Sequence, residues 1–355
     1  MKTLARLARL ACLALCWPLA AAAQDAVPLP CPQADSACLF KALHAHPARK
    51  LAAWEKLLAE PLVERIVPAP PTLLEYLAWD NAANGYPNRP RRAAPSRVFA
   101  AEMTAALAEL PREVQLLFAN RLAGIALVED LGGTGYTDVI IDAAGQPVAG
   151  YVVLDAGVLE RFTANQWVTW KERTPFQPDA DWQLDARIED DARDNRRQAI
   201  QYILLHELGH VLSIGRDVHP PWTVQPKEGG PDAAYPFFGL SWRTEGNAYV
   251  SHFDDAFTVR RQVSYYFGAK LAGDRMAEAY RQLAKTNFPT LYAAAHPGDD
   301  FAESFASYVH VVLMQRPWEI VVRRGGHDEV VFKSCWDEER CRAKRTLLEA
   351  IVGKP

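Results

Sequence analysis

The pentapeptide His206-Glu207-Leu208-Gly209-His210 constrains this chain more than any other feature of its sequence. On an α-helix, residues four positions apart lie on one face, so both imidazoles can reach a single metal ion, and the Glu207 side chain is directed toward the same cleft. Zinc is well suited to neutral imidazole ligands and lowers the pKa of its bound water to about 7, so a neighbouring carboxylate can take the proton. The motif therefore predicts His206 and His210 as Zn²⁺ ligands and Glu207 as a general base.

The residues around the motif indicate a helix over roughly 195 to 214. Asp191 or Asp194 is suited to cap its start, and Gly215 offers a stop. An apolar face runs along it, formed by Ile200, Ile203, Leu204, Val211 and Ile214. The alternative is a chance match on a purely structural helix, and the combination of motif and helical context favours the zinc site.

The first residues have the pattern of a secretion signal. Lys2, Arg6 and Arg9 precede a mostly apolar run, and Ala21-Ala22-Ala23 provides a small-residue cleavage site before Gln24. The run is shorter than the ~20 residues of a spanning helix, so we expect export without stable membrane insertion. Lipoprotein processing at Cys16 is the alternative, although Leu15 stands where a small residue is expected.

Four of the six cysteines follow the predicted signal, in two close pairs: Cys31 with Cys38, and Cys335 with Cys341. An even number of cysteines in an exported chain is typical of disulfides, most simply two local loops. A four-cysteine zinc site is the alternative, and the spacings fit it poorly.

The net charge of −4 becomes more negative when the basic signal leaves, which argues against nucleic acid as the main partner. We expect a signal peptide at 1–23, a helical N-terminal region at 24–96 and a catalytic domain at 97–355. Helical patterns cover Ser36 to about Ile66, Leu73 to Trp79, Val98 to Leu110 and Pro111 to Ala123.

A β-hairpin is predicted from Val139-Ile140-Ile141, a turn at Ala144 to Pro147, and Tyr151 to Leu154. An edge strand beside a metal cleft can pair with an extended peptide through its backbone, which suits a protease. Gly132 to Gly135, just before these strands, lacks the Lys-Ser/Thr ending of a phosphate loop and is interpreted as a turn.

A catalytic zinc site needs a third protein ligand from elsewhere in the chain. The metzincin extension is excluded, because Ser213 and Arg216 stand where glycine and histidine are required. A second helix is predicted over Asp299 to Tyr308, and Glu303 in it is the leading candidate ligand. His219 and Glu245 remain as alternatives.

The segment Tyr292-Ala-Ala-Ala-His296-Pro-Gly-Asp299-Asp-Phe-Ala-Glu303-Ser-Phe-Ala resembles the third-ligand motif of gluzincin-type bacterial zinc peptidases, which are also similar to the catalytic domain of anthrax lethal factor. The resemblance covers this segment and the HExxH motif. It implies an α+β, zincin-like fold in which Glu303 binds zinc and Tyr292 helps to hold the developing oxyanion. The chain departs from the thermolysin-type pattern at Ser307, where an aspartate is expected.

Other residues near the motifs have expected supporting roles. Asp299 or Asp300 is expected to orient a ligand histidine, and Tyr265 is the alternative to Tyr292. His252 and His296 are expected to be structural or to support a ligand from behind.

Together these features predict an exported zinc metallopeptidase, periplasmic or secreted, that acts on a peptide or protein. A zinc amidase of cell-wall peptides and a non-catalytic zincin-fold binding module are the alternatives, because fold resemblance alone does not decide function.

Overall fold

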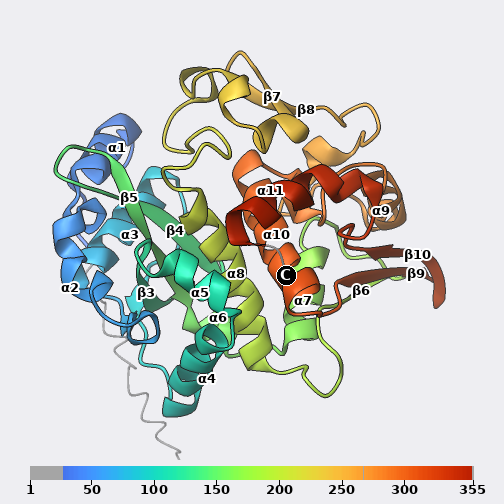
Figure 1. Ribbon diagram of the computed structural model, residues 1–355, viewed down its shortest axis with the longest axis horizontal. Helices are drawn as coiled ribbons and strands as arrows, with labels where there is room; N and C mark the ends of the chain where they lie inside the picture. The colour runs from blue at the N-terminus through green and yellow to red at the C-terminus, as the bar shows by residue number, and fades with distance from the viewer. Residues whose placement is uncertain (1–26, 267, 354–355) are drawn as a thin grey trace, which may run out of the picture.

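The structure, a computed structural model, describes residues 27–266 and 268–353, so the predicted signal at 1–23 lies outside the described residues. The described chain has an α+β fold, as expected. Its strands form a five-stranded, a three-stranded and a two-stranded sheet, and its helices pack around them (Figure 1).

The largest sheet has the strand order β1-β3-β5-β4, and β2 pairs with the free part of β3. β1 and β5 run parallel to β3, whereas β4 runs antiparallel to β5 and forms the end of the sheet. The predicted hairpin is confirmed as β4 and β5. The strands are β1 (Ile66–Pro68), β2 (Arg91–Arg92), β3 (Leu122–Glu129), β4 (Gly135–Ile141) and β5 (Pro147–Asp155).

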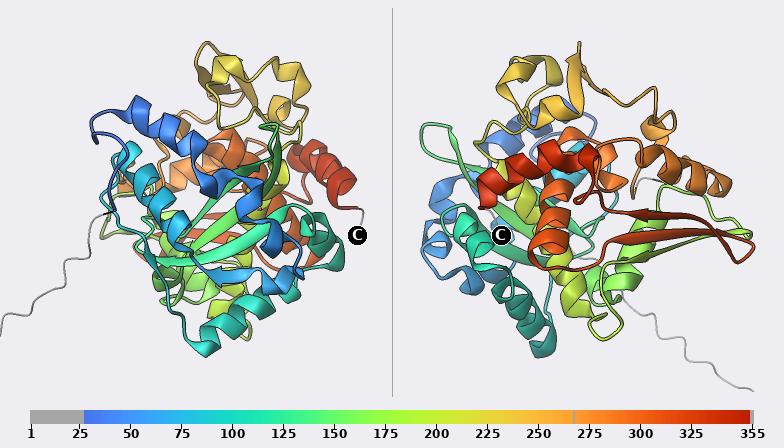
Figure 2. Two further views of the ribbon diagram at one scale, coloured as in Figure 1. Left: turned by 90° about the vertical axis from the view of Figure 1, so that its left-hand side faces the viewer. Right: turned by 45° about the vertical axis from the view of Figure 1, so that its right-hand side comes forward.

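Successive side chains along a strand point to opposite faces of the sheet, so this sheet has two apolar faces to bury. Helices cover both of them. Tyr151 and Val153 of β5 pack with the N-terminal helices α1 (Ser36–Ala45), α2 (Glu55–Leu58) and α3 (Pro71–Ala83). Val152 and Leu154 pack on the opposite side, which α8 (Arg196–Ser213) covers. The two helical layers with the sheet between them are visible in Figures 1 and 2.

The N-terminal region is less helical than its sequence pattern predicts. Between Ala45 and Ile66 the chain forms short turns of helix, because Pro47 and Pro61 interrupt any longer one. The region also supplies β1 and β2 to the large sheet, and so shares a core with the rest of the chain.

The helix predicted over Pro111 to Ala123 is also shorter than expected. It ends at Phe118, and Leu122 begins β3, an apolar run buried on both faces. The helices α4 (Arg97–Ala108), α5 (Arg112–Phe118) and α6 (Ala156–Leu159) lie on the same side of the sheet as α8.

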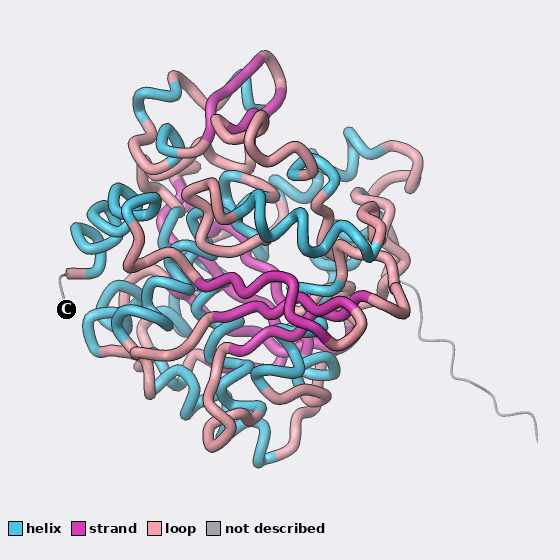
Figure 3. Tube along the Cα trace, turned by 90° about the vertical axis from the view of Figure 1, so that its right-hand side faces the viewer, coloured by secondary structure: helices cyan, strands magenta, loops and turns pink. Residues whose placement is uncertain are grey.

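The remainder of the chain packs against the other side of α8. It contains α7 (Ala164–Arg173), α9 (Met276–Leu283), α10 (Pro297–Tyr308), which ends in a π-helical turn at Val309–Leu313, and α11 (Arg342–Val352). β6 (Trp182–Arg187), β9 (Glu319–Arg324) and β10 (His327–Lys333) form an antiparallel sheet in the order β10-β9-β6 (Figure 3). β7 (Trp242–Glu245) and β8 (Ala248–Ser251) form a separate hairpin.

Both predicted cysteine pairs are disulfides, Cys31 with Cys38 and Cys335 with Cys341. Disulfides persist in oxidising compartments outside the cytosol, which agrees with an exported protein. None of the described helices is long and apolar enough to cross a bilayer.

Candidate metal centre

The HExxH motif lies on α8, a helix whose residues are mostly buried. Asn195 caps the helix, its side chain accepting from the backbone N–H of Gln198, in place of the expected Asp191 or Asp194. Gly215 follows the end of the helix in the left-handed conformation that glycine adopts freely. Burial on both sides fixes the rotation of α8, and therefore the direction in which its two histidines point.

Three donor atoms converge at the motif. The Nε2 atoms of His206 and His210 lie 3.2 Å apart, and Oδ1 of Asp299 lies 3.9 Å and 3.7 Å from them respectively. Nitrogen and oxygen ligands bound to zinc at about 2.0–2.1 Å are separated by about 3.3 Å in a tetrahedron. Within the described residues, these three side chains form the one group able to share a metal ion in this way.

Glu303 lies in a different place from the one expected of a third ligand. Its Oε1 is 2.9 Å from Nδ1 of His206, the ring nitrogen on the other side from His210 and Asp299. The place expected for Glu303 beside the two histidines is taken by Asp299, one helical turn earlier on α10. A carboxylate bonded to the second nitrogen of a ligand histidine fixes its tautomer and ring orientation, which is the role expected of Asp299 or Asp300.

Glu303 is held in its charged form by its surroundings. Nζ of Lys171 lies 2.9 Å from Oε1, and the Thr290 hydroxyl donates to Oε2 at 2.8 Å. Burial alone would raise the pKa of Glu303, but the charge of Lys171 and the hydrogen bond with His206 hold this pKa well below its usual range. Glu303 is therefore placed to accept a proton carried on Nδ1 of His206.

Glu207 faces the edge strand β4. The Thr137 hydroxyl of β4 donates to Oε2 of Glu207 at 2.6 Å, and burial raises the pKa of the carboxyl. A Cβ at Gly135 would lie only 2.4 Å from Oε1 of Glu207, so a larger residue there would require the Glu207 side chain to shift. Gly135, the first residue of β4, thus borders the site, although its sequence context predicts only a turn.

Tyr292 lies beside the three convergent side chains. Its ring stacks on that of His206, with centroids 5.3 Å apart and planes 17° from parallel. Burial raises the pKa of Asp299 to about 6, although His206 and a hydrogen bond with Tyr292 lower it. Tyr265 instead donates to Glu172 at 2.8 Å, so its hydroxyl is committed elsewhere.

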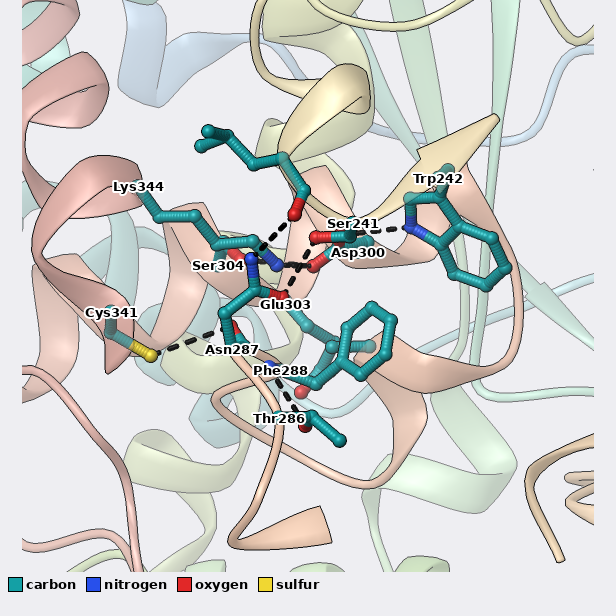
Figure 4. Close-up of polar contacts among 12 residues, drawn as sticks. Ser241, Trp242, Thr286, Asn287, Phe288, Asp300, Glu303, Ser304, Cys341 and Lys344 are labelled. Carbon is teal, nitrogen blue, oxygen red and sulfur yellow. Dashed lines mark hydrogen bonds and ion pairs between the residues drawn. The ribbon is translucent and has the colours of Figure 1, made fainter. Parts of the chain in front are cut away.

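The remaining candidates lie outside the group. Nδ1 of His219 is 2.8 Å from the carbonyl oxygen of Pro220, and Glu245 is exposed on β7, where it pairs with Arg243. His296 caps α10 and His252 is exposed on a loop. Asp300 faces away from the histidines, toward Trp242 and Lys344 (Figure 4).

Two cavities of about 660 Å³ and 240 Å³ meet at this group, and both are lined by His206, Glu207 and Tyr292. They share the Gly135 end of β4 and Trp222. The larger cavity also reaches the N-terminal region, where Asp80 of α3 is part of its wall. The chemistry-bearing residues therefore lie along one cleft beneath an edge strand.

Several residues of the site carry no signal in the sequence. Lys171, Thr137 and Thr290 come from a helix, a strand and a loop far apart in the sequence, and only the fold brings them together. The i, i+4 spacing of Asp299 and Glu303 is a usable signal, because two carboxylates one turn apart on a helix can address two nitrogens of one imidazole.

Comparison of the chain with family models, curated proteins and solved structures finds no match. The functional interpretation therefore depends on the geometry of the site itself.

Proposed function

We propose that the protein is an exported, zinc-dependent metallopeptidase of the zincin-like type, acting in the periplasm or the surrounding medium. The observation that carries this proposal is the convergence of His206, His210 and Asp299 at the cleft into which Glu207 points. The proposed ligands are these three residues, with Asp299 in place of the expected Glu303. The likeness to gluzincin-type peptidases remains part of the proposal, with the revised ligand set.

The proposed chemistry divides the work among the side chains of the cleft. Zinc, when bound, lowers the pKa of water and polarises a carbonyl group. Glu207 accepts the proton of the attacking water and passes it to the amine that leaves when the C–N bond breaks. Thr137 holds Oε2 of Glu207, which leaves Oε1 to carry this proton. The Tyr292 hydroxyl donates to the oxyanion that develops on the carbonyl oxygen.

The position of β4 supports a peptide as the substrate. β4 is the last strand in the order β1-β3-β5-β4, so its outer edge has backbone groups available to an extended chain at the Gly135 end. Further along this edge, Ile141 forms a bridge with Lys50, and the Val139 N–H donates to the Asp138 side chain. The Gly135 end of this strand lies directly over Glu207. A peptide added to that edge would bring its carbonyl groups past the general base.

Glu207→Gln is the direct test of this proposal. The variant keeps the size of the side chain and the metal ligands but removes the base, so we expect near-stoichiometric zinc by elemental mass spectrometry and loss of essentially all peptide hydrolysis. Unmodified protein and the variant are compared on a mixed peptide library, with cell-wall fragments as a parallel substrate. Undiminished hydrolysis by Glu207→Gln would contradict the mechanism, and cleavage confined to wall fragments would replace the peptidase by an amidase.

A further inference from the structure

Lys171 on α7 is a buried cation next to the candidate metal centre. Its side chain is 2% exposed, and its Nζ lies 2.9 Å from Oε1 of Glu303 and 3.6 Å from Oε1 of Glu172. The same Nζ lies 4.6 Å from the centroid of the Tyr292 ring. Taking an ammonium group out of water is unfavourable unless charges and dipoles replace its hydration. Here two carboxylates and an aromatic face do so.

The contacts of Lys171 lead to the metal site along two routes. Oε1 of Glu303 is shared, because it lies 2.9 Å from Nζ of Lys171 and 2.9 Å from Nδ1 of His206. The second route is the Tyr292 ring, which has Lys171 over it and is stacked on His206. One ammonium group thus contacts both the carboxylate and the ring that confine the His206 imidazole.

We propose that Lys171 is a positioning residue of the metal centre, acting through Glu303 and Tyr292 rather than on substrate. By holding Oε1 of Glu303 in place at 2.9 Å, Lys171 keeps this acceptor against Nδ1 of His206 and so orients the ring with Nε2 toward His210 and Asp299. By holding the Tyr292 ring, it keeps that hydroxyl beside the site. The inference depends on the proposed function, in which His206 is a zinc ligand.

Another buried lysine provides a matched control. Lys344 of α11 forms an ion pair with Asp300, both side chains being 0% exposed, and the Trp242 indole donates to the same carboxylate at 3.0 Å (Figure 4). Asp300 lies on α10 beside Asp299, but its carboxylate has no contact with the histidines among the interactions of the described chain. Lys344→Met therefore removes a buried charge next to α10 without changing the contacts of Lys171 with Glu303 and Tyr292.

The test compares Lys171→Met with Lys344→Met in the otherwise unaltered protein. The zinc dissociation constant is measured by chelator competition, the stability of the metal-free protein by thermal unfolding, and kcat and KM on a cleaved peptide. Mutating groups that orient a metal ligand weakens metal binding by about 10- to 100-fold. We expect a loss in this range for Lys171→Met, with a fall in kcat and little change in KM. Lys344→Met should lower the unfolding temperature but leave the zinc affinity within about twofold.

A double variant separates positioning from a general loss of stability. If Lys171 acts through Glu303, the Lys171→Met substitution should weaken zinc binding much less in the Glu303→Gln variant than in the unmodified protein. The effects of substitutions at coupled residues are not additive. Lys171→Gln, which keeps a donor without the charge, replaces Lys171→Met in the same comparison if the methionine variant does not fold.

The outcomes distinguish this inference from the proposed function. Unchanged zinc affinity in Lys171→Met or Lys171→Gln, or additive effects with Glu303→Gln, would overturn the positioning role even in an active peptidase. Zinc binding without any peptide cleavage would overturn the proposed peptidase function, and the zinc affinities of the lysine variants would still test the positioning role. If the unmodified protein binds no metal, both proposals fail.

Discussion

Gly209 of α8 lies directly against Ala302 of α10, so closely that a Cβ on Gly209 would be 2.6 Å from the Cα of Ala302. His206 and His210 flank this glycine on α8, and Asp299 and Glu303 flank the alanine at the same offsets on α10. The point of closest helix contact therefore lies between the two pairs. Close backbone approach is what lets short carboxylate side chains reach both ring nitrogens of His206.

Gly209→Ala should force the two helices apart. Overpacking a core contact typically costs about 1–3 kcal/mol, and here the neighbouring atoms are backbone, which relaxes poorly. We expect a loss of stability in this range by chemical denaturation, together with weaker zinc binding. Gly239→Ala is the control, because nothing lies within 4 Å of the added methyl group. Equal zinc affinity in Gly209→Ala and the unmodified protein would show that this contact does not set the metal site.

The exchanged roles of Asp299 and Glu303 lead to a second prediction. Asp299→Ala removes a proposed ligand, so we expect zinc content well below stoichiometric after dialysis. Glu303→Gln keeps a carbonyl acceptor for Nδ1 of His206, so zinc should remain, with an affinity about 10- to 100-fold lower. Elemental mass spectrometry and chelator competition on both variants measure the difference. The reverse result, with zinc lost only on mutation of Glu303, would restore the ligand set expected from the sequence.

Tyr292 and Tyr265 make a matched pair for testing oxyanion stabilisation. Removing one oxyanion donor typically lowers kcat by about 10²- to 10³-fold. Tyr292→Phe should therefore lower kcat by about that factor while zinc content and KM change little. Tyr265→Phe should instead leave kcat nearly unchanged and reduce stability, because its hydroxyl donates to the buried Glu172. Steady-state kinetics on one peptide decide between them, and an equal loss of kcat in both variants would contradict the assignment.

The sequence is informative where a local pattern carries the structure. The HExxH helix, the β4–β5 hairpin, the helix around Glu303 and both disulfides follow from periodicity, turn residues and cysteine spacing. It is less informative where rotation of a helix decides the outcome. Asp299 and Glu303 are both suited to bind zinc, and only the packing of α10 on α8 determines which nitrogen of His206 each one meets.

Contacts between distant segments were likewise beyond prediction. Lys171 reaches Glu303 across 132 positions of the chain, and nothing in its own helix distinguishes it from a surface lysine. The spacing of the leucines in the N-terminal region predicts a helix, but Pro47 and Pro61 break it, and pairing with β3 makes Ile66–Pro68 a strand. Tertiary pairing overrides local propensity in such a segment.

The stability of the protein should depend on pH through the carboxyl group of Asp80, which lines the larger cavity. Burial, with the nearby charge of Asp138, raises the pKa of Asp80 from 3.8 to about 6. A folded-state pKa above the unfolded value means that folding is favoured by the protonated form. The stabilising contribution is therefore fully present below pH 3.8 and is lost as the pH rises through about 6.

Asp80→Asn should remove this contribution to the pH dependence of stability, because the amide does not ionise in this pH range. We expect the variant and the unmodified protein to unfold at similar temperatures near pH 4, and the variant to be more stable at pH 8, by on the order of 1 kcal/mol after solvent screening. Glu55→Gln, at an exposed position of α2, is the control for removal of one negative charge. Thermal unfolding of the metal-free proteins between pH 4 and pH 8 measures the effect. A stability difference that stays constant across this range would mean that the Asp80 carboxyl titrates alike in the folded and unfolded chains.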